Sequence, residues 1–178
     1  MKFAQELVIT GGLYKGQKIT APGGKTHPMG ERERLAIMNS VMSYLEDAEV
    51  IDFYAGSGAL GIEAISRGAK KVTLVEKDNK AYKTILSNLK KLGIDESKAS
   101  VILSDAKSAD AKGNVIFLDP PYDNMNEFDQ EILANFKDAD AIVISHPEDY
   151  KIDDLEGFNR KDKSYAKCFV TIFTNKNF

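Results

Sequence analysis

The sequence predicts an α/β fold built around a parallel, doubly wound sheet. Strand-like and helix-like segments alternate between residues 50 and 145, and a glycine-rich turn follows the first of these strands. The chain has 178 residues, of which 43% are hydrophobic, a size that suits one α/β core with a short additional segment. In such a sheet, ligands gather beyond the carboxyl ends of the strands, so we expect the functional residues there.

We expect residues 1–45 to form an N-terminal segment in front of a main domain at 46–178. Glycines mark turns between two short strand-like stretches, and apolar side chains recur at helical spacing over residues 31–45. The segment is therefore predicted to be a hairpin-like opening followed by a helix.

Basic residues gather in this opening segment. Residues 1–34 contain six Lys or Arg and three Glu, although the whole chain has a net charge of −3. Arginines near a helix start oppose the helix dipole, which suggests an anionic partner. We expect phosphate groups of such a partner to be contacted by Lys15, Lys18, Arg32 and Arg34.

The main domain is expected to continue the alternation of strands and helices to the C-terminus. Gly93 should stop one helix, and residues 157–163 are polar and turn-like. The predicted strands are 50–54, 71–76, 100–103, 114–118, 141–145 and 167–174, and the predicted helices are 59–67, 79–92 and 127–136.

The turn that contains Gly56, Gly58 and Gly61 is the first candidate ligand site. Its spacing matches a dinucleotide fingerprint, and Glu76 lies where a ribose-binding acid would sit. Asp52 would repel a pyrophosphate but favour a cationic ligand. We therefore expect S-adenosylmethionine, which carries an ammonium and a sulfonium, with a nicotinamide dinucleotide as the alternative.

The run Asp119-Pro120-Pro121-Tyr122 is the second candidate site. Its two prolines hold the backbone extended after a buried strand. The Asp119 carboxylate and the Pro120 carbonyl could accept both N–H bonds of a nucleobase amine, while Tyr122 stacks on the ring. A plain turn after a strand is the alternative.

Apolar runs, the single cysteine and the two histidines limit the location and the chemistry that we expect. No apolar run is long enough to span a bilayer and no signal peptide is visible, so we expect a cytoplasmic protein. The single cysteine, Cys168, is expected in the core. His27 and His146 show no metal-ligand spacing, and we expect no metal. His27 could contact phosphate or substrate and His146 could line the target pocket, or each could have no role.

Four ordered motifs together resemble the class I S-adenosylmethionine-dependent methyltransferases. Most closely they resemble the RsmD family, which methylates the exocyclic N2 of a guanine in small-subunit (16S) ribosomal RNA. Three further segments extend the resemblance over nearly the whole chain: Gly12-Leu-Tyr-Lys15-Gly16, residues 28–39 and Ser164-Tyr165. The four motifs are Asp52-Phe-Tyr-Ala-Gly-Ser-Gly-Ala-Leu-Gly-Ile-Glu-Ala, Val75-Glu-Lys-Asp78, Asp105-Ala106 and Asp119-Pro-Pro-Tyr122.

The resemblance implies a Rossmann-like, seven-stranded, mostly parallel sheet whose last strand is antiparallel. It implies that Asp119, Pro120 and Tyr122 are catalytic and act on ribosomal RNA, with free RNA and an assembling small-subunit particle as the two alternatives for the substrate. It implies a donor site made of the glycine turn, the ribose acid and the adenine-binding turn. By these matches the donor-binding residues are Asp52, Tyr54, Gly56, Ser57, Gly58, Glu76, Lys77, Asp105 and Ala106.

This chain departs from the family pattern on the target side. His27-Pro28-Met29 stands where the family has Arg-Pro-Thr, Leu35 where an acid is usual, and Ser145 where a glutamate is usual. The nucleotide therefore stays open, as do two other functions. The first is methylation of DNA adenine or protein glutamine, and the second is donor or RNA binding without catalysis, as in an assembly factor.

Overall fold

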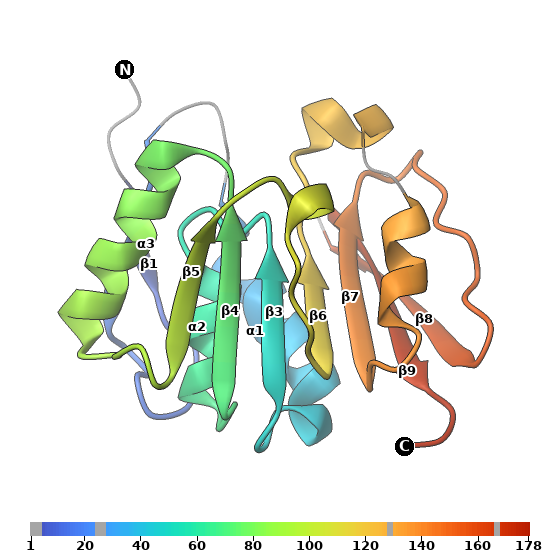
Figure 1. The fold of residues 1–178 in the computed structure, drawn as a ribbon, viewed down its shortest axis with the longest axis horizontal. Coiled ribbons are helices and arrows are strands. Elements are labelled where there is room, and N and C mark those ends of the chain that lie inside the picture. The colour runs from blue at the N-terminus through green and yellow to red at the C-terminus, as the bar shows by residue number, and fades with distance from the viewer. Residues whose placement is uncertain (1–4, 24–27, 128–129, 166–167) are drawn as a thin grey trace.

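The computed structural model describes residues 5–23, 28–127, 130–165 and 168–178. Seven strands form one sheet in the order β5-β4-β3-β6-β7-β9-β8, in which β9 runs antiparallel to both of its neighbours (Figure 1). This confirms the expected sheet and its antiparallel last strand. The strands are β3 (Glu49–Phe53), β4 (Lys71–Glu76), β5 (Ala99–Leu103), β6 (Val115–Leu118), β7 (Ala141–His146), β8 (Phe158–Tyr165) and β9 (Cys168–Asn175).

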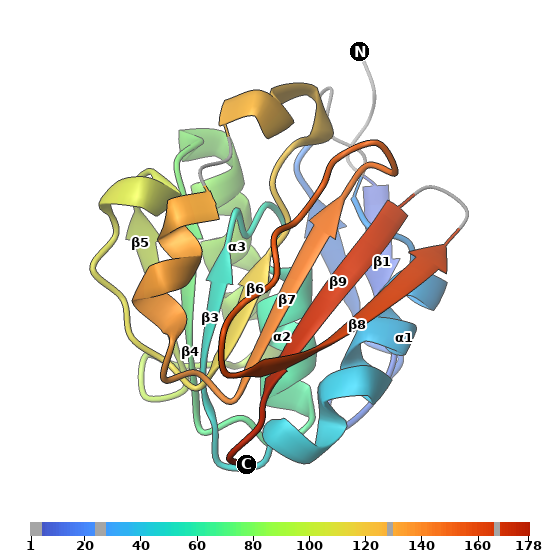
Figure 2. The same ribbon diagram turned by 90° about the vertical axis from the view of Figure 1, so that its right-hand side faces the viewer.

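Helical elements cover both faces of the sheet. Figure 2 shows α1, α2 and the N-terminal hairpin on one side of the sheet and the orange 3₁₀ helix η4 on the other. No helix in the described part of the chain is long and apolar enough to cross a membrane. The helices are α1 (Glu31–Val41), α2 (Ala59–Ser66), α3 (Asn79–Leu92) and the 3₁₀ helices η1 (Met42–Tyr44), η2 (Ala106–Ser108), η3 (Tyr122–Glu127) and η4 (Gln130–Phe136).

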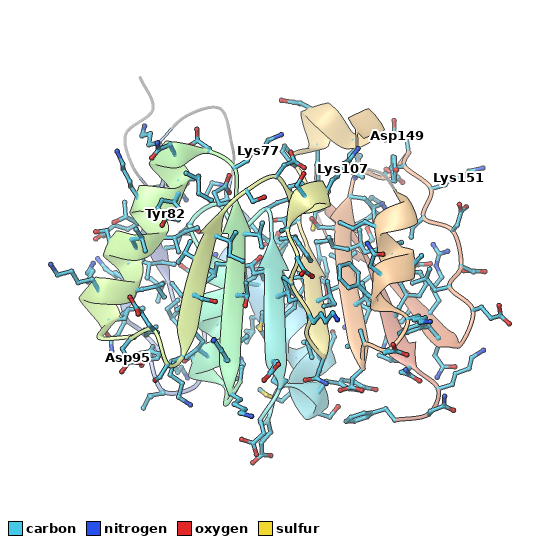
Figure 3. All side chains as sticks on the ribbon, in the orientation of Figure 1. Lys77, Tyr82, Asp95, Lys107, Asp149 and Lys151 are labelled. Carbon is cyan, nitrogen blue, oxygen red and sulfur yellow. The ribbon has the colours of Figure 1, made fainter. Side chains whose placement is uncertain are left out.

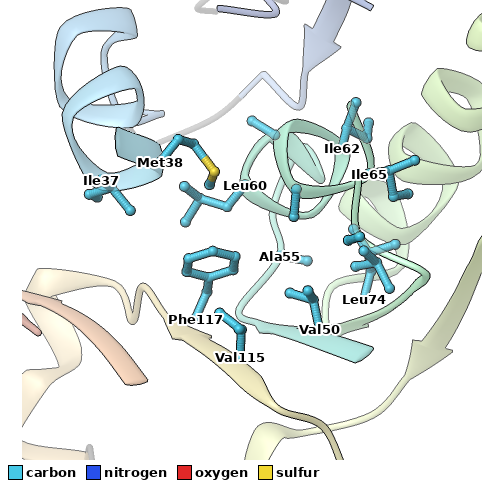
Figure 4. Close-up of a cluster of buried hydrophobic side chains, with 14 of the residues drawn as sticks. Ile37, Met38, Val50, Ala55, Leu60, Ile62, Ile65, Leu74, Val115 and Phe117 are labelled. Atoms are coloured by element: carbon cyan, nitrogen blue, oxygen red, sulfur yellow. The ribbon is translucent and has the colours of Figure 1, made fainter. Parts of the chain in front are cut away.

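The larger core lies between the sheet and the α-helices. Met38 of α1, Leu60 of α2 and Phe117 of β6 meet there, and all three are buried (Figure 4). A second apolar cluster lies on the opposite face, around Phe53 and Phe136, whose ring centroids are 5.5 Å apart. Because β6 is buried on both faces, its four residues are all apolar, as is usual in a central parallel strand.

The predicted hairpin is present as the antiparallel pair β1 (Gln5–Val8) and β2 (Lys18–Ala21). Its apolar side chains belong to the same buried cluster as those of the sheet and the α-helices. The connecting loop rests on the end of α2, where the Leu13 N–H donates to the Ser66 carbonyl over 2.7 Å. Gly12 has a φ of +75°, and a Cβ there would lie 1.8 Å from that carbonyl, so only glycine fits.

Helix α3 has the bounds that the sequence predicts. The Asp78 side chain caps its start by accepting from the Ala81 N–H over 2.8 Å. Gly93 ends it in the left-handed conformation, with a φ of 68°. Local capping chemistry therefore determines both ends of this helix.

Two predicted elements are wrong. An α-helix was expected over 127–136, but the described residues there form the 3₁₀ helices η3 and η4, with 128–129 outside the described residues. Residues 157–163 were expected to be a turn, but most of them belong to the edge strand β8. Most β8 side chains are exposed, so the apolar alternation that would reveal a strand is missing.

Candidate functional site

The glycine turn joins the carboxyl end of β3 to the start of α2. Tyr54, Gly56 and Gly58 all have positive φ, of 62°, 57° and 77°, and the tyrosine is the less usual residue in this region. Gly61 lets the helix pack closely, because a Cβ there would lie 2.9 Å from side-chain atoms of both Leu74 and Val72. The turn thus brings the backbone N–H groups of a helix start to the edge of the sheet.

Asp52 lies under this turn and not on its surface. Its side chain is buried, and Oδ2 accepts a hydrogen bond from the Gly61 N–H over 2.9 Å. Burial raises the pKa of Asp52 to about 8, the Gly61 bond lowers it, and the charges of Asp119 and Glu76 raise it further. The raised pKa favours the protonated form of Asp52 in the free protein, and its role toward a ligand stays a prediction.

Glu76, at the end of β4, is bonded to the turn by both of its carboxylate oxygens. Oε2 accepts from the Gly56 N–H and Oε1 from the Asp78 N–H, each over 2.8 Å. Each oxygen of an ionised carboxylate can accept a further bond, so Glu76 is still able to receive two ligand hydroxyls.

Asp105 and Ala106 follow β5 at the same edge of the sheet. Asp105 accepts from the Lys107 N–H over 3.0 Å, and its other oxygen lies 3.6 Å from Lys77 Nζ. Figure 3 shows Lys77 and Lys107 together at this edge. Burial, followed by the charge of Asp105, raises the pKa of Tyr54 to about 12. The structure thus gathers most of the predicted donor-site residues along three strand ends.

Asp119 follows β6 and forms a cluster with residues of β7 and β9. The buried Ser145 hydroxyl donates to Asp119 Oδ1, and the Tyr122 hydroxyl interacts with both Ser145 and Cys168. Burial raises the pKa of Asp119, and the Ser145 bond opposes that rise. Burial likewise raises the pKa of Cys168, to about 11, and of Tyr122. Cys168 is buried, as expected, but it lies at the site.

Arg34 was expected to contact phosphate, and the structure corrects this. Its guanidinium is fully buried, donates to the carbonyls of Met29 (2.6 Å) and Val8 (2.7 Å), and has Nε 3.5 Å from Glu63 Oε1. Arg67 pairs with the same Glu63 carboxylate. The anionic partner of Arg34 is therefore inside the protein, and Arg34 offers no surface to RNA.

The other three basic residues are exposed but separated. Lys18 pairs with Glu6 over 2.9 Å. Lys15 belongs to the loop that rests on the last turn of α2, away from the glycine turn. Arg32 lies in the first turn of α1.

Asn88 is a site residue that sequence reasoning missed. Its amide donates to the carbonyls of Thr20 (2.8 Å) and Ser57 (2.9 Å), and its Oδ1 accepts from the Thr20 N–H over 2.9 Å. It therefore ties the hairpin and α3 to the glycine turn. A polar residue on the apolar face of α3, between Ile85 and Leu92, is the signal that could have found it.

Of the two histidines, only His146 lies in the part of the chain that the structure describes. His27 lies outside the described residues. His146 ends β7, is buried, and has Nε2 3.0 Å from Thr171 Oγ1 and Nδ1 2.9 Å from the Pro147 carbonyl. Among the residues that the structure describes, no group of three or more His, Cys, Asp or Glu could hold a metal ion.

Comparison with known proteins identifies relatives of this chain. It is 36% identical over 124 residues to "Ribosomal RNA small subunit methyltransferase D" of Haemophilus influenzae, a match covering 66% of this chain and 64% of the relative. The protein of the same name from Escherichia coli K12 is 37% identical over 122 residues, covering 66% of this chain and 61% of the relative. The chain thus spans less than two thirds of the length of these relatives.

A solved structure agrees over a longer stretch. "Putative methyltransferase yhhF from Escherichia coli" has a TM-score of 0.81 and 27% identity, covering 96% of this chain and 98% of that chain. The family described as Conserved hypothetical protein 95 matches residues 7–174. Because this match runs over almost the whole sequence, the chain belongs to that family, and its resemblance to ribosomal RNA small subunit methyltransferase D is confirmed.

Proposed function

We propose that this protein transfers a methyl group from S-adenosylmethionine to the exocyclic N2 amine of a guanine in small-subunit ribosomal RNA. The observation that carries the proposal is the arrangement at the carboxyl edge of the sheet. Asp119 is held by Ser145 after β6, which lies beside β3 and its glycine turn, and Glu76 ends the strand on the other side of β3. The proposed donor and acceptor sites would therefore lie side by side.

The residues of the donor side fit a sulfonium nucleoside. The backbone at Gly56 and Gly58 would take the methionine part, Glu76 the ribose hydroxyls, and Asp105 with Ala106 the adenine. Tyr54, Ser57 and Lys77 border the same turns. Bound there, the donor supplies an electrophilic methyl group on a positively charged sulfur. The acids around it favour that charge, and Asp52 should lose its proton when a cation arrives.

On the target side, Asp119 and the Pro120 carbonyl would accept the two N–H bonds of the base amine, and Tyr122 would stack on the ring. The lone pair of such an amine is delocalised, so orientation toward the methyl group provides much of the catalysis. The new C–N bond would replace the C–S bond of the donor, leaving a neutral thioether, and the cationic amine nitrogen would then give its extra proton to Asp119. Ser145 keeps the accepting carboxylate in place.

The names of the relatives support ribosomal RNA as the substrate class. Guanine N2 as the target rests on the resemblance alone. Adenine in DNA and glutamine in a protein are the competing acceptors, because a planar amide or amine could use the same pair of acceptors. An assembly factor that binds donor or RNA without catalysis is the competing function of another class.

The test is transfer of labelled methyl groups to ribosomal RNA or to small-subunit particles from a strain that lacks this protein. We expect one N2-methylguanosine by mass spectrometry of the digested RNA. Asp119→Ala should abolish transfer while donor binding, measured by calorimetry, stays. Label in DNA or protein instead of RNA, or full transfer by Asp119→Ala, would contradict the proposal.

A further inference from the structure

We propose that the edge strand β8 carries a binding surface for the RNA backbone beside the methylated base. The surface, here called the β8 basic face, consists of Lys161, Lys163 and Tyr165. This inference rests on the proposed function and specifies where the RNA lies.

The strand register places the β8 basic face next to the catalytic cluster. Lys163 is paired with Val170 of β9, and Val170 is paired with Ser145 of β7. Ser145 in turn bonds Asp119, so these four residues form one row across the sheet. Strands are about 4.8 Å apart, which puts the Lys163 backbone roughly 14 Å from that of Asp119.

Two residues further along β8, a second pair on the same face also approaches the catalytic cluster. Tyr165 is paired with Cys168, and the Cys168 side chain interacts with Tyr122. Tyr165 is therefore the aromatic residue at which the β8 basic face approaches the target side. An RNA strand that delivers a base between Asp119 and Tyr122 would reach β8 within a short length of backbone.

The two lysines point to the same face of the sheet. Their partners in the register, Val170 and Ile172, belong to the cluster that packs against α1, and Lys163 Nζ donates to Ser40 of α1. Alternate residues of β8 point the other way, where Arg160 pairs with Asp154 (2.9 Å) and Asp162 (3.0 Å). One face of β8 is thus neutralised, and the other is basic.

The charge on the basic face has no partner in the described part of the chain. Neither lysine lies within ion-pair distance of a described carboxylate there. Burial, followed by the charge of Lys161, lowers the pKa of Lys163. Burial raises the pKa of Tyr165, and the charge of Glu33 adds a smaller rise, so this acid lies close to that end of the surface. Two adjacent unpaired cations destabilise the free protein and favour an anion such as a phosphate backbone.

Arg32 lies one residue before Glu33 in the first turn of α1 and is exposed. It would extend the surface toward the N-terminal segment. Of the phosphate contacts expected from the sequence, it is the one that this placement supports.

The experiment compares RNA binding by the wild type and by the double variant Lys161→Ala, Lys163→Ala over a range of salt concentrations. We expect about tenfold weaker binding at low salt and a salt slope reduced by roughly 1.4 to 1.8, since each phosphate contact contributes about 0.7 to 0.9. KM for RNA should rise while kcat changes little. Lys161→Arg, Lys163→Arg should restore binding.

Lys90→Ala, Lys91→Ala is the matched control, because these two adjacent lysines end α3 and are exposed. It should bind RNA like the wild type, and both double variants should bind S-adenosylmethionine normally. If the β8 variant behaves like this control while the wild type methylates RNA, the inference fails and the proposed function stands. If the wild type neither binds nor methylates RNA, the proposed function fails and the inference fails with it.

Discussion

Asp52 should determine how stability depends on pH. Its pKa rises from an ordinary 3.8 to about 8 on folding, so between these values the folded state holds a proton that the unfolded state has lost. Stability should therefore fall as pH rises from about 4 to about 8. Asp52→Asn, which keeps an acceptor for the Gly61 N–H, should be more stable than the wild type at pH 8, on the order of 4 kcal/mol.

The measurement is urea unfolding of both proteins at pH 5, 7 and 9. Burial also raises the pKa of Asp119, so part of the slope should persist in the variant. A wild type and an Asp52→Asn protein with parallel profiles would show that Asp52 is already ionised in the free protein.

Ser145→Ala should move the pH dependence of methyl transfer. In the proposed mechanism Asp119 accepts from the base amine as a carboxylate, so kcat should rise with pH through the Asp119 pKa. The Ser145 hydroxyl lowers that pKa by donating to the carboxylate. Without this hydroxyl, the pH at which kcat rises should increase by about one to two units, which is the equivalent of one hydrogen bond to a charged group.

Ser145→Thr keeps the hydroxyl, so the pH at which kcat rises should return toward the wild-type value. If Ser145 had a purely structural role, kcat of Ser145→Ala and Ser145→Thr would rise at the same pH. The readout is kcat across pH 6 to 10 at saturating donor. If kcat depends on pH in the same way in the wild type and in Ser145→Ala, Ser145 does not position Asp119.

At the residue scale, sequence reasoning locates the acids of the candidate site but does not predict how burial shifts their pKa values. Asp52, Glu76 and Asp119 follow from motif position, because strand ends of a parallel sheet meet at one edge. The buried state of Asp52 and of Arg34 depends on which segments pack above them. No local pattern reports that packing, so the same reasoning placed a core arginine on the surface.

At the scale of elements, one buried cluster of charged residues connects the hairpin loop, α1 and α2. Glu63 of α2 pairs with Arg34 and Arg67 and accepts from the Thr10 N–H over 2.8 Å. Breaking such a cluster at one member leaves a buried charge with fewer partners. Arg34→Ala should therefore destabilise the fold by about 3 to 5 kcal/mol.

Arg32→Ala provides the comparison, since Arg32 is an exposed arginine two residues earlier in the same helix. It should change the free energy of unfolding by less than about 0.5 kcal/mol. Both values come from chemical denaturation at pH 7. Equal effects of the two substitutions would mean that Glu63 is satisfied without Arg34.

The sequence predicts an element well when capping residues mark its ends, and poorly when the element is a strand at the edge of the sheet. Helix α3 has an Asp cap and a terminal Gly93, and its predicted bounds are confirmed. Strand β8 is mostly polar and exposed, so it is a strand only because β9 offers it a partner. Residues 127–136 have helix-like apolar spacing, but the structure has 3₁₀ turns in their described part. Pairing partners far along the chain decide such cases.

Across the whole molecule, the N-terminal hairpin is connected to the glycine turn through Asn88. This side chain of α3 bonds both polar backbone groups of Thr20 in β2 and the carbonyl of Ser57 in the glycine turn. The hairpin also shares its apolar cluster with the sheet. Hairpin, helix and turn should therefore respond together when this connection is removed.

Asn88→Ala tests that connection. It leaves three backbone groups of Thr20 and Ser57 without this partner, so we expect a loss of about 1 to 3 kcal/mol for each group that stays buried. Hydrogen exchange should accelerate in both β2 and the glycine turn, and donor affinity should weaken. Ser87→Ala, at the exposed neighbouring position, should leave exchange and affinity unchanged. Faster exchange confined to β2 would show instead that residues 1–45 open separately from the main domain.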